Sequence, residues 1–112
     1  MPQFMLLLHG DPATWTKLSP EEHQKAQERY RAWTQKAFTR DAKRLADDPG
    51  RIVRPGGGQP RVADGPYSET KEILGGYYTI EAASYDEAVQ LCMDHPQLVY
   101  GGTIEVRQVW GS

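Results

Sequence analysis

The residues best suited to chemistry gather in one segment, residues 64–72, which reads Asp-Gly-Pro-Tyr-Ser-Glu-Thr-Lys-Glu. It places an aromatic ring and four ionisable side chains directly before an apolar run typical of a strand. Asp-Gly-Pro is a turn signal, because Gly accepts positive φ and Pro presets its own φ. A turn needs only that tripeptide. The density of polar groups beside an expected sheet therefore makes this segment the first place to look for a site.

His23 and Asp64 are the candidate pair for acid–base chemistry. A neutral imidazole exchanges protons near pH 7, as a general base must, and His23 falls on the inward face of an expected helix. If Asp64 reached this ring, it would orient the ring and favour the imidazolium. Two structural roles compete: a hydrogen-bonded histidine at a helix N-terminus, and an aspartate that caps its own turn. The sequence leaves these alternatives open.

Four further side chains are candidates for ligand binding. Lys71 or Arg107 would hold an anionic group of a small organic ligand. A hydroxyl of Tyr67 or Tyr77 that faced a cavity would donate a hydrogen bond to such a ligand. Each has a structural alternative, because the lysine and acids such as Glu69 can form surface salt bridges, while tyrosines often serve packing alone.

Two elements near the N-terminus would position His23. Residues 4–8 read Phe-Met-Leu-Leu-Leu, which is apolar on both faces and typical of a strand covered on both sides. Residues 19–22, Ser-Pro-Glu-Glu, form a helix start with a capping box. We expect this helix to end between residues 40 and 44, although residues 43–46 also fit a short strand. One inward face of the helix would consist of residues 23, 26, 30, 33 and 37.

The sequence of residues 51–63 predicts a hairpin. Residues 51–54 and 59–63 flank Pro-Gly-Gly-Gly at residues 55–58, a flexible tip between two short strands. The glycines lack the following Lys-Ser/Thr and the helix start of a phosphate-binding loop. Three further elements complete the chain: a strand over residues 77–82, a helix over residues 84–94 opened by a second capping box, and a strand over residues 103–109.

The element order β-α-β-(hairpin)-β-α-β predicts an α+β protein, with a ferredoxin-like split βαβ fold, an antiparallel sheet and an inserted β-hairpin. Two helices would cover one face of the sheet, with Ile80, Ile104 and Val106 beneath them. The second face combines an apolar strand with polar and aromatic side chains, namely Tyr77, Thr79, Glu81, Glu105 and Arg107. Such a face suits a sheet packed on its own copy around a partly polar cavity, so we expect a homodimer.

Length, charge and composition exclude several classes of protein. The chain has 112 residues, which fits one domain over residues 1–112, and its net charge of −2 with scattered basic residues argues against a nucleic-acid-binding surface. The longest apolar runs are far shorter than a membrane span, and a single cysteine excludes an intrachain disulfide, so we expect a cytoplasmic protein without a membrane partner. Dinucleotide, phosphate-loop, haem and metal-ligand motifs are missing, so we expect no cofactor and no metal.

Residues 64–72 resemble the DGPF motif of the YCII-related domain family, usually Asp-Gly-Pro-Phe-x-Glu-Thr-Lys-Glu, with Tyr67 in place of the usual Phe. Residues 4–11, residues 75–78 and residues 100–107 are similar to the same family, so the resemblance covers nearly the whole chain. It implies a ferredoxin-like, dimeric α-β barrel whose biochemical role is largely undefined.

In the wider family, a His near the start of the first helix and an Asp are a proposed acid–base pair. His23 matches that His by position, whereas Gln35 stands roughly where an acidic residue is usual and Asp41 lies further on. Our first hypothesis is a small enzyme acting by acid–base chemistry on an organic metabolite in a cavity near the dimer interface. The alternative is a non-catalytic ligand-binding or protein-interaction module, accessory to transcription regulation.

Overall fold

Four antiparallel strands form the central sheet, in the order β2-β5-β1-β6. The computed structural model describes residues 1–67 and 71–112, and Glu69 lies outside these residues. Because β5 lies between β1 and β2, those two strands run parallel without touching, as in a split βαβ unit. The predicted α+β, ferredoxin-like architecture is therefore confirmed. The strands are β1 (Gln3–Gly10), β2 (Thr39–Arg44), β5 (Ile73–Glu81) and β6 (Thr103–Gln108).

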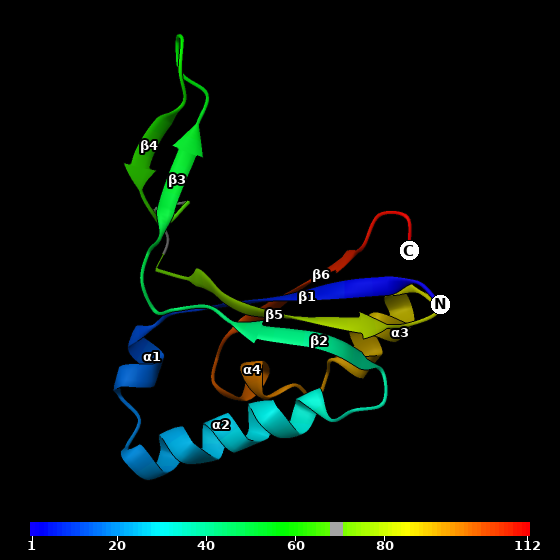
Figure 1. Cartoon of the computed structure of the whole chain (residues 1–112). Coiled ribbons are helices and arrows are strands. Elements are labelled where there is room, and N and C mark those ends of the chain that lie inside the picture. The colour runs from blue at the N-terminus through cyan, green and yellow to red at the C-terminus, as the bar shows by residue number, and fades with distance from the viewer. Residues whose placement is uncertain (68–70) are drawn as a thin grey trace.

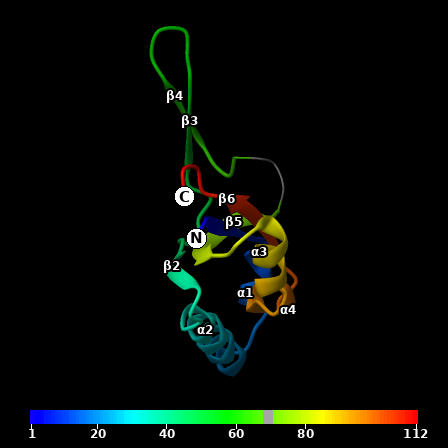
Figure 2. The same ribbon diagram turned by 90° about the vertical axis from the view of Figure 1, so that its right-hand side faces the viewer.

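Helices cover one side of the sheet, and a separate hairpin rises on the other side (Figures 1 and 2). The hairpin pairs β3 (Arg51–Arg54) with β4 (Arg61–Asp64), as the sequence predicted, although β4 begins two residues later than expected. None of the helices in the described part of the chain is long and apolar enough to cross a bilayer. The helices are α1 (Ala13–Thr16), α2 (Pro20–Thr34), α3 (Tyr85–Leu91) and α4 (Pro96–Val99).

The core lies between the sheet and the helices. Phe4, Leu6 and Leu8 alternate along β1 and are buried, while the residues between them are half-buried on the other face. The ladder places Leu6 opposite both Tyr78 and Val106, so these residues share the helix-covered face. The predicted inward set is confirmed in this way: Ile80, Ile104 and Val106.

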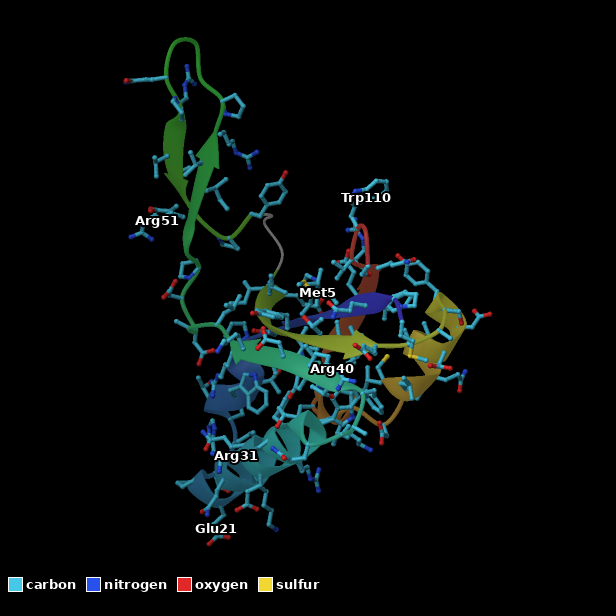
Figure 3. The ribbon with its side chains drawn as sticks, turned by 45° about the vertical axis from the view of Figure 1, so that its right-hand side comes forward. Met5, Glu21, Arg31, Arg40, Arg51 and Trp110 are labelled. Atoms are coloured by element: carbon cyan, nitrogen blue, oxygen red, sulfur yellow. The ribbon has the colours of Figure 1, made fainter. Side chains whose placement is uncertain are left out.

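The opposite face, which we call the open face, carries the residues that the sequence assigned to it. Leu7 pairs with Tyr77 on β5 and with Glu105 on β6, and Met5 pairs with Thr79 and Arg107. Strand alternation puts all of these side chains away from the helices. Figure 3 shows this side, with Met5 above the sheet.

Helix α2 starts as predicted and ends earlier. Ser19 Oγ accepts a hydrogen bond from Glu22 N at 3.2 Å, and Glu22 Oε1 accepts one from Ser19 N at 3.1 Å, which confirms the capping box. The expectation that the helix reaches residues 40–44 is wrong, because that segment instead forms β2 and pairs with β5. Ala37, expected on the inward face, lies beyond the helix end and is exposed.

The Asp-Gly-Pro turn lies at the base of the hairpin. Gly65 N donates a hydrogen bond to Gly50 O at 3.0 Å. The turn does not use the positive φ that Gly accepts, since Gly65 is not among the glycines with positive φ. A side chain at this position would instead collide with the carbonyl of Pro49. Close approach of two backbone segments therefore explains this glycine.

His95 caps a helix that the sequence did not predict. Its Nδ1 accepts a hydrogen bond from Gln97 N at 3.0 Å, at the start of α4. The ring is fully buried, with its centroid 4.6 Å from the rings of both Trp33 and Tyr78. Burial lowers the pKa of His95 to about 4. The ring is therefore neutral and caps α4.

Gln97 joins three elements. Its Oε1 accepts a hydrogen bond from Tyr30 Oη at 2.6 Å, and its Nε2 donates one to the carbonyl of His9 at 2.8 Å. Tyr78 Oη donates to the carbonyl of Tyr30 at 2.9 Å. Gly102 leaves room for this arrangement, because a Cβ there would strike the Gln97 side chain. Helix α2, helix α4 and the end of β1 are thereby held together.

His95 predicts a pH dependence of stability. Folding lowers the pKa of His95 from the ordinary 6.5 to about 4. Between these two pH values the unfolded chain is protonated at His95, whereas the folded protein is not. The stability that depends on a neutral ring is complete above pH 6.5 and is lost as the pH falls towards 4. The loss should be roughly 3 kcal/mol. Urea unfolding of wild type and His95→Asn, which keeps a capping oxygen, should show a flatter pH profile for the variant. Parallel profiles would contradict this account.

The hydrogen bonds of Gln97 predict that two matched substitutions differ in their effect on the free energy of unfolding. Gln97→Leu leaves the Tyr30 hydroxyl and the His9 carbonyl without their partner, at a cost of roughly 2–4 kcal/mol. Gln90→Leu, on the exposed side of α3, should change the free energy of unfolding by less than about 0.5 kcal/mol. Equal effects of the two variants in denaturant unfolding would show that the Gln97 hydrogen bonds contribute little.

Candidate functional site

A cavity of about 530 Å³ lies between α1, α2 and the helix-covered face of the sheet. Such a volume fits a small organic molecule. Its aromatic wall consists of Trp15 from α1, Tyr30 from α2 and Tyr78 from β5. Leu8 and Ile73 add apolar surface. The cavity thus combines an apolar lining with the polar groups described below.

Helix α1 supplies Trp15, and sequence reasoning missed it. Asp11 Oδ1 accepts a hydrogen bond from Ala13 N at 2.9 Å, which starts this short helix. The Trp15 ring then packs on Tyr100 and Tyr30, with centroids 5.3 and 5.7 Å away. Four residues are too few to show a helical period, so the Asp-Pro pair that precedes them is the one local signal.

His23 lines the cavity from the first turn of α2. Its side chain is half-buried, and its ring centroid lies 6.3 Å from that of Trp15. Within the described residues its imidazole makes no side-chain hydrogen bond, so both nitrogens remain available to a bound molecule. The helical spacing that indicated an inward face did identify this position.

The charged lining of the cavity comes from α2 and β2. Arg31 is one helical turn further than Gln27 on α2, and Arg44 is the last residue of β2. Lys43 also borders the cavity, but it pairs with Tyr77, so its side chain points to the open face. Asp47 supplies a carboxylate, and its Oδ2 lies 3.1 Å from Arg44 Nη2. Nothing in the local sequence shows that the chain bends back towards α2 at Asp47.

Asp64 does not line this cavity. Its carboxylate is 86% exposed and lies 3.5 Å from Arg51 Nε, across the hairpin. Figure 1 shows the hairpin on the side of the sheet opposite to α2. Among the described residues no hydrogen bond links Asp64 to His23. The structure therefore brings only the histidine of the candidate pair to the cavity.

Of the four candidate ligand-binding residues, only Tyr77 borders the cavity. Its side chain nevertheless points to the open face, together with that of its β1 partner Leu7. The Tyr77 hydroxyl donates a hydrogen bond to Asp41 Oδ2 at 3.0 Å, which raises the Tyr77 pKa. Tyr67 is 75% exposed, with the Arg54 guanidinium 5.1 Å above its ring. Lys71 is exposed.

Arg107 belongs to a polar cluster on the open face. Its Nη1 donates to Glu105 Oε2 at 3.3 Å, and His9 Nε2 lies 3.1 Å from Glu105 Oε1. Hydrogen bonds from His9 and then Arg107 lower the pKa of Glu105. Sequence reasoning missed this histidine–carboxylate contact, which follows from the pairing of β1 with β6.

Comparison with known proteins identifies a family but names no activity. Residues 3–111 match the YCII-related domain. A segment of 42 residues, 38% of this chain, is 48% identical to a protein of Rhizobium meliloti (strain 1021) that is named only as uncharacterised. The match spans 34% of that relative, about a third of its length. Because the domain match extends over nearly the whole chain, this protein belongs to the YCII-related domain family.

Proposed function

We propose that this protein binds a small organic metabolite in the cavity between α1, α2 and the sheet, and that His23 exchanges a proton with it. The observation that carries this proposal is an imidazole on the cavity wall whose nitrogens make no hydrogen bond within the described part of the chain. Histidine is the side chain best suited to proton exchange near neutral pH.

The other polar groups of the cavity suit supporting roles. Burial raises the pKa of Tyr78 to about 12 and that of Tyr30 further, so both hydroxyls stay protonated at neutral pH. Asp47, in place of Asp64, supplies the carboxylate of the cavity. Such a set fits lyase, isomerase or hydrolase chemistry by proton transfer. A ligand-binding module without turnover would use the same cavity.

We also propose a homodimer formed through the open face. Met5 and Leu7 are half-buried there, none of the helices in the described residues covers this face, and Trp110 is 99% exposed. Figure 3 shows Met5, Trp110 and the hairpin on the side opposite to Arg31 of α2. The hairpin exposes further apolar surface, because the cross-strand pair Val53 and Val62 is about two-thirds exposed, at 66% and 68%. Two isolated strands are marginal in water, so a covering partner would stabilise them.

His23 is tested by removing its proton exchange while keeping a hydrogen-bonding side chain. In a screen of metabolite pools, wild type should consume or convert a compound, and His23→Gln should lower that rate by about 10²–10⁴-fold. Gln24→Ala, at the neighbouring exposed position of α2, should leave the rate unchanged. Turnover that survives in His23→Gln would refute the catalytic role. A compound that binds wild type and is never converted would favour the non-catalytic alternative.

Light scattering tests the dimer. Wild type at micromolar concentration should have the mass of two chains, whereas Leu7→Lys should have the mass of one, because a charge would be buried between the two sheets. Leu98→Lys, on the partly exposed α4, should remain dimeric. A monomeric wild type would disprove the face-to-face arrangement.

A further inference from the structure

We infer that the ligand of the cavity is a planar organic carboxylate, held by Arg31 at its charged end and by Trp15 along its ring. This inference rests on the proposed function, because it names the chemical class that the same cavity would accept. It moves the anion-binding role from Lys71 and Arg107, which lie outside the cavity, to α2.

The charges of the lining favour an anion. Two cationic side chains, Arg31 and Arg44, face one carboxylate, that of Asp47. Arg44 is already paired with Asp47 at 3.1 Å. Arg31 forms no ion pair within the described part of the chain. The cavity wall therefore keeps uncompensated positive charge, while its carboxylate is occupied and offers little to an amine.

Arg31 suits a carboxylate in particular. A guanidinium presents parallel N–H groups that match the two oxygens of a carboxylate, which gives both strength and orientation. Arg31 lies two helical turns beyond His23 on α2, and both residues line the cavity. A carboxylate bound at Arg31 would thus leave the body of the ligand along the helix, within the cavity that His23 also lines.

The aromatic wall suits a planar body. The Tyr30 hydroxyl is engaged by Gln97, so this half-buried residue offers ring surface more than a hydrogen bond, whereas Tyr78 is buried behind it with its hydroxyl on the Tyr30 carbonyl. Trp15 is half-buried and tilted by 57° from Tyr30. An aromatic or conjugated ligand gains stacking energy on such a wall, which an aliphatic chain of the same size does not.

The inference is tested by calorimetric titration of the dimer or monomer as purified, with cinnamate and benzoate as probes. Acetate, inorganic phosphate, cinnamamide and benzylamine serve as comparison ligands. Cinnamate should bind at least about 10-fold more tightly than its neutral amide, because the amide loses the charge-assisted hydrogen bonds. Acetate should bind weakly because it has no ring. Equal binding of cinnamamide or benzylamine, or no binding of either aromatic carboxylate at millimolar concentration, would overturn the inference.

Variants assign the binding to named residues. Arg31→Gln should weaken cinnamate binding by at least about 10-fold. Arg31→Lys should restore part of this affinity, because lysine keeps the positive charge but lacks the paired N–H groups of the guanidinium. Trp15→Leu should weaken cinnamate more than acetate. Lys25→Gln removes the same charge from the exposed side of α2 and should leave binding unchanged. An equal loss in Lys25→Gln and Arg31→Gln would show a general charge effect and refute the assignment.

The outcome separates this inference from the proposed function. Carboxylate binding that is lost in Arg31→Gln and kept in His23→Gln supports the ligand class, even where no turnover is found. Conversion of a neutral or cationic compound that depends on His23 would refute the ligand class and leave the proton-transfer role intact.

Discussion

The position of β1 at the centre of the sheet is the constraint on which the rest of the structure depends. Both edges of this strand are paired, with β5 and with β6, so its backbone groups are satisfied away from water. Phe4, Leu6 and Leu8 are buried beneath the helices, each contributing about 1.5–3 kcal/mol. A shift by one residue would turn these side chains to the open face, and this cost sets the register of the neighbouring strands.

That register also places the cavity. Tyr78 lies opposite Leu6, and its hydroxyl reaches the Tyr30 carbonyl on α2. Trp33 packs near the end of α2, where the helix lies closest to the core, whereas His23 in the first turn lies beside α1 and the cavity. Gln97 holds the same helix to the end of β1. A single set of contacts thus gives both a rigid core and an open space next to it.

The site was predictable only where helical spacing applied. His23 could be found because it repeats with Tyr30 and Trp33 on one face of α2. Arg31 lies next to that face, but its charge resembles the solvated side of the helix, so the pattern gave no reason to place it at a cavity. Asp64 was chosen because of its dense polar neighbourhood, yet the hairpin that carries it rises from the other side of the sheet (Figure 1).

Local chemistry determined much of this protein from its sequence alone: the capping box at Ser19, the alternating faces of the strands, the hairpin and the α+β element order. These features depend on neighbours a few residues away, and spacing records such neighbours directly. The tertiary structure decided what depends on distant partners: the end of α2, the neutral cap at His95, and the meeting of Trp15, His23 and Arg31 around one cavity. Pairing of β2 with β5 ended the helix, because strand hydrogen bonds and burial outweighed local helix propensity.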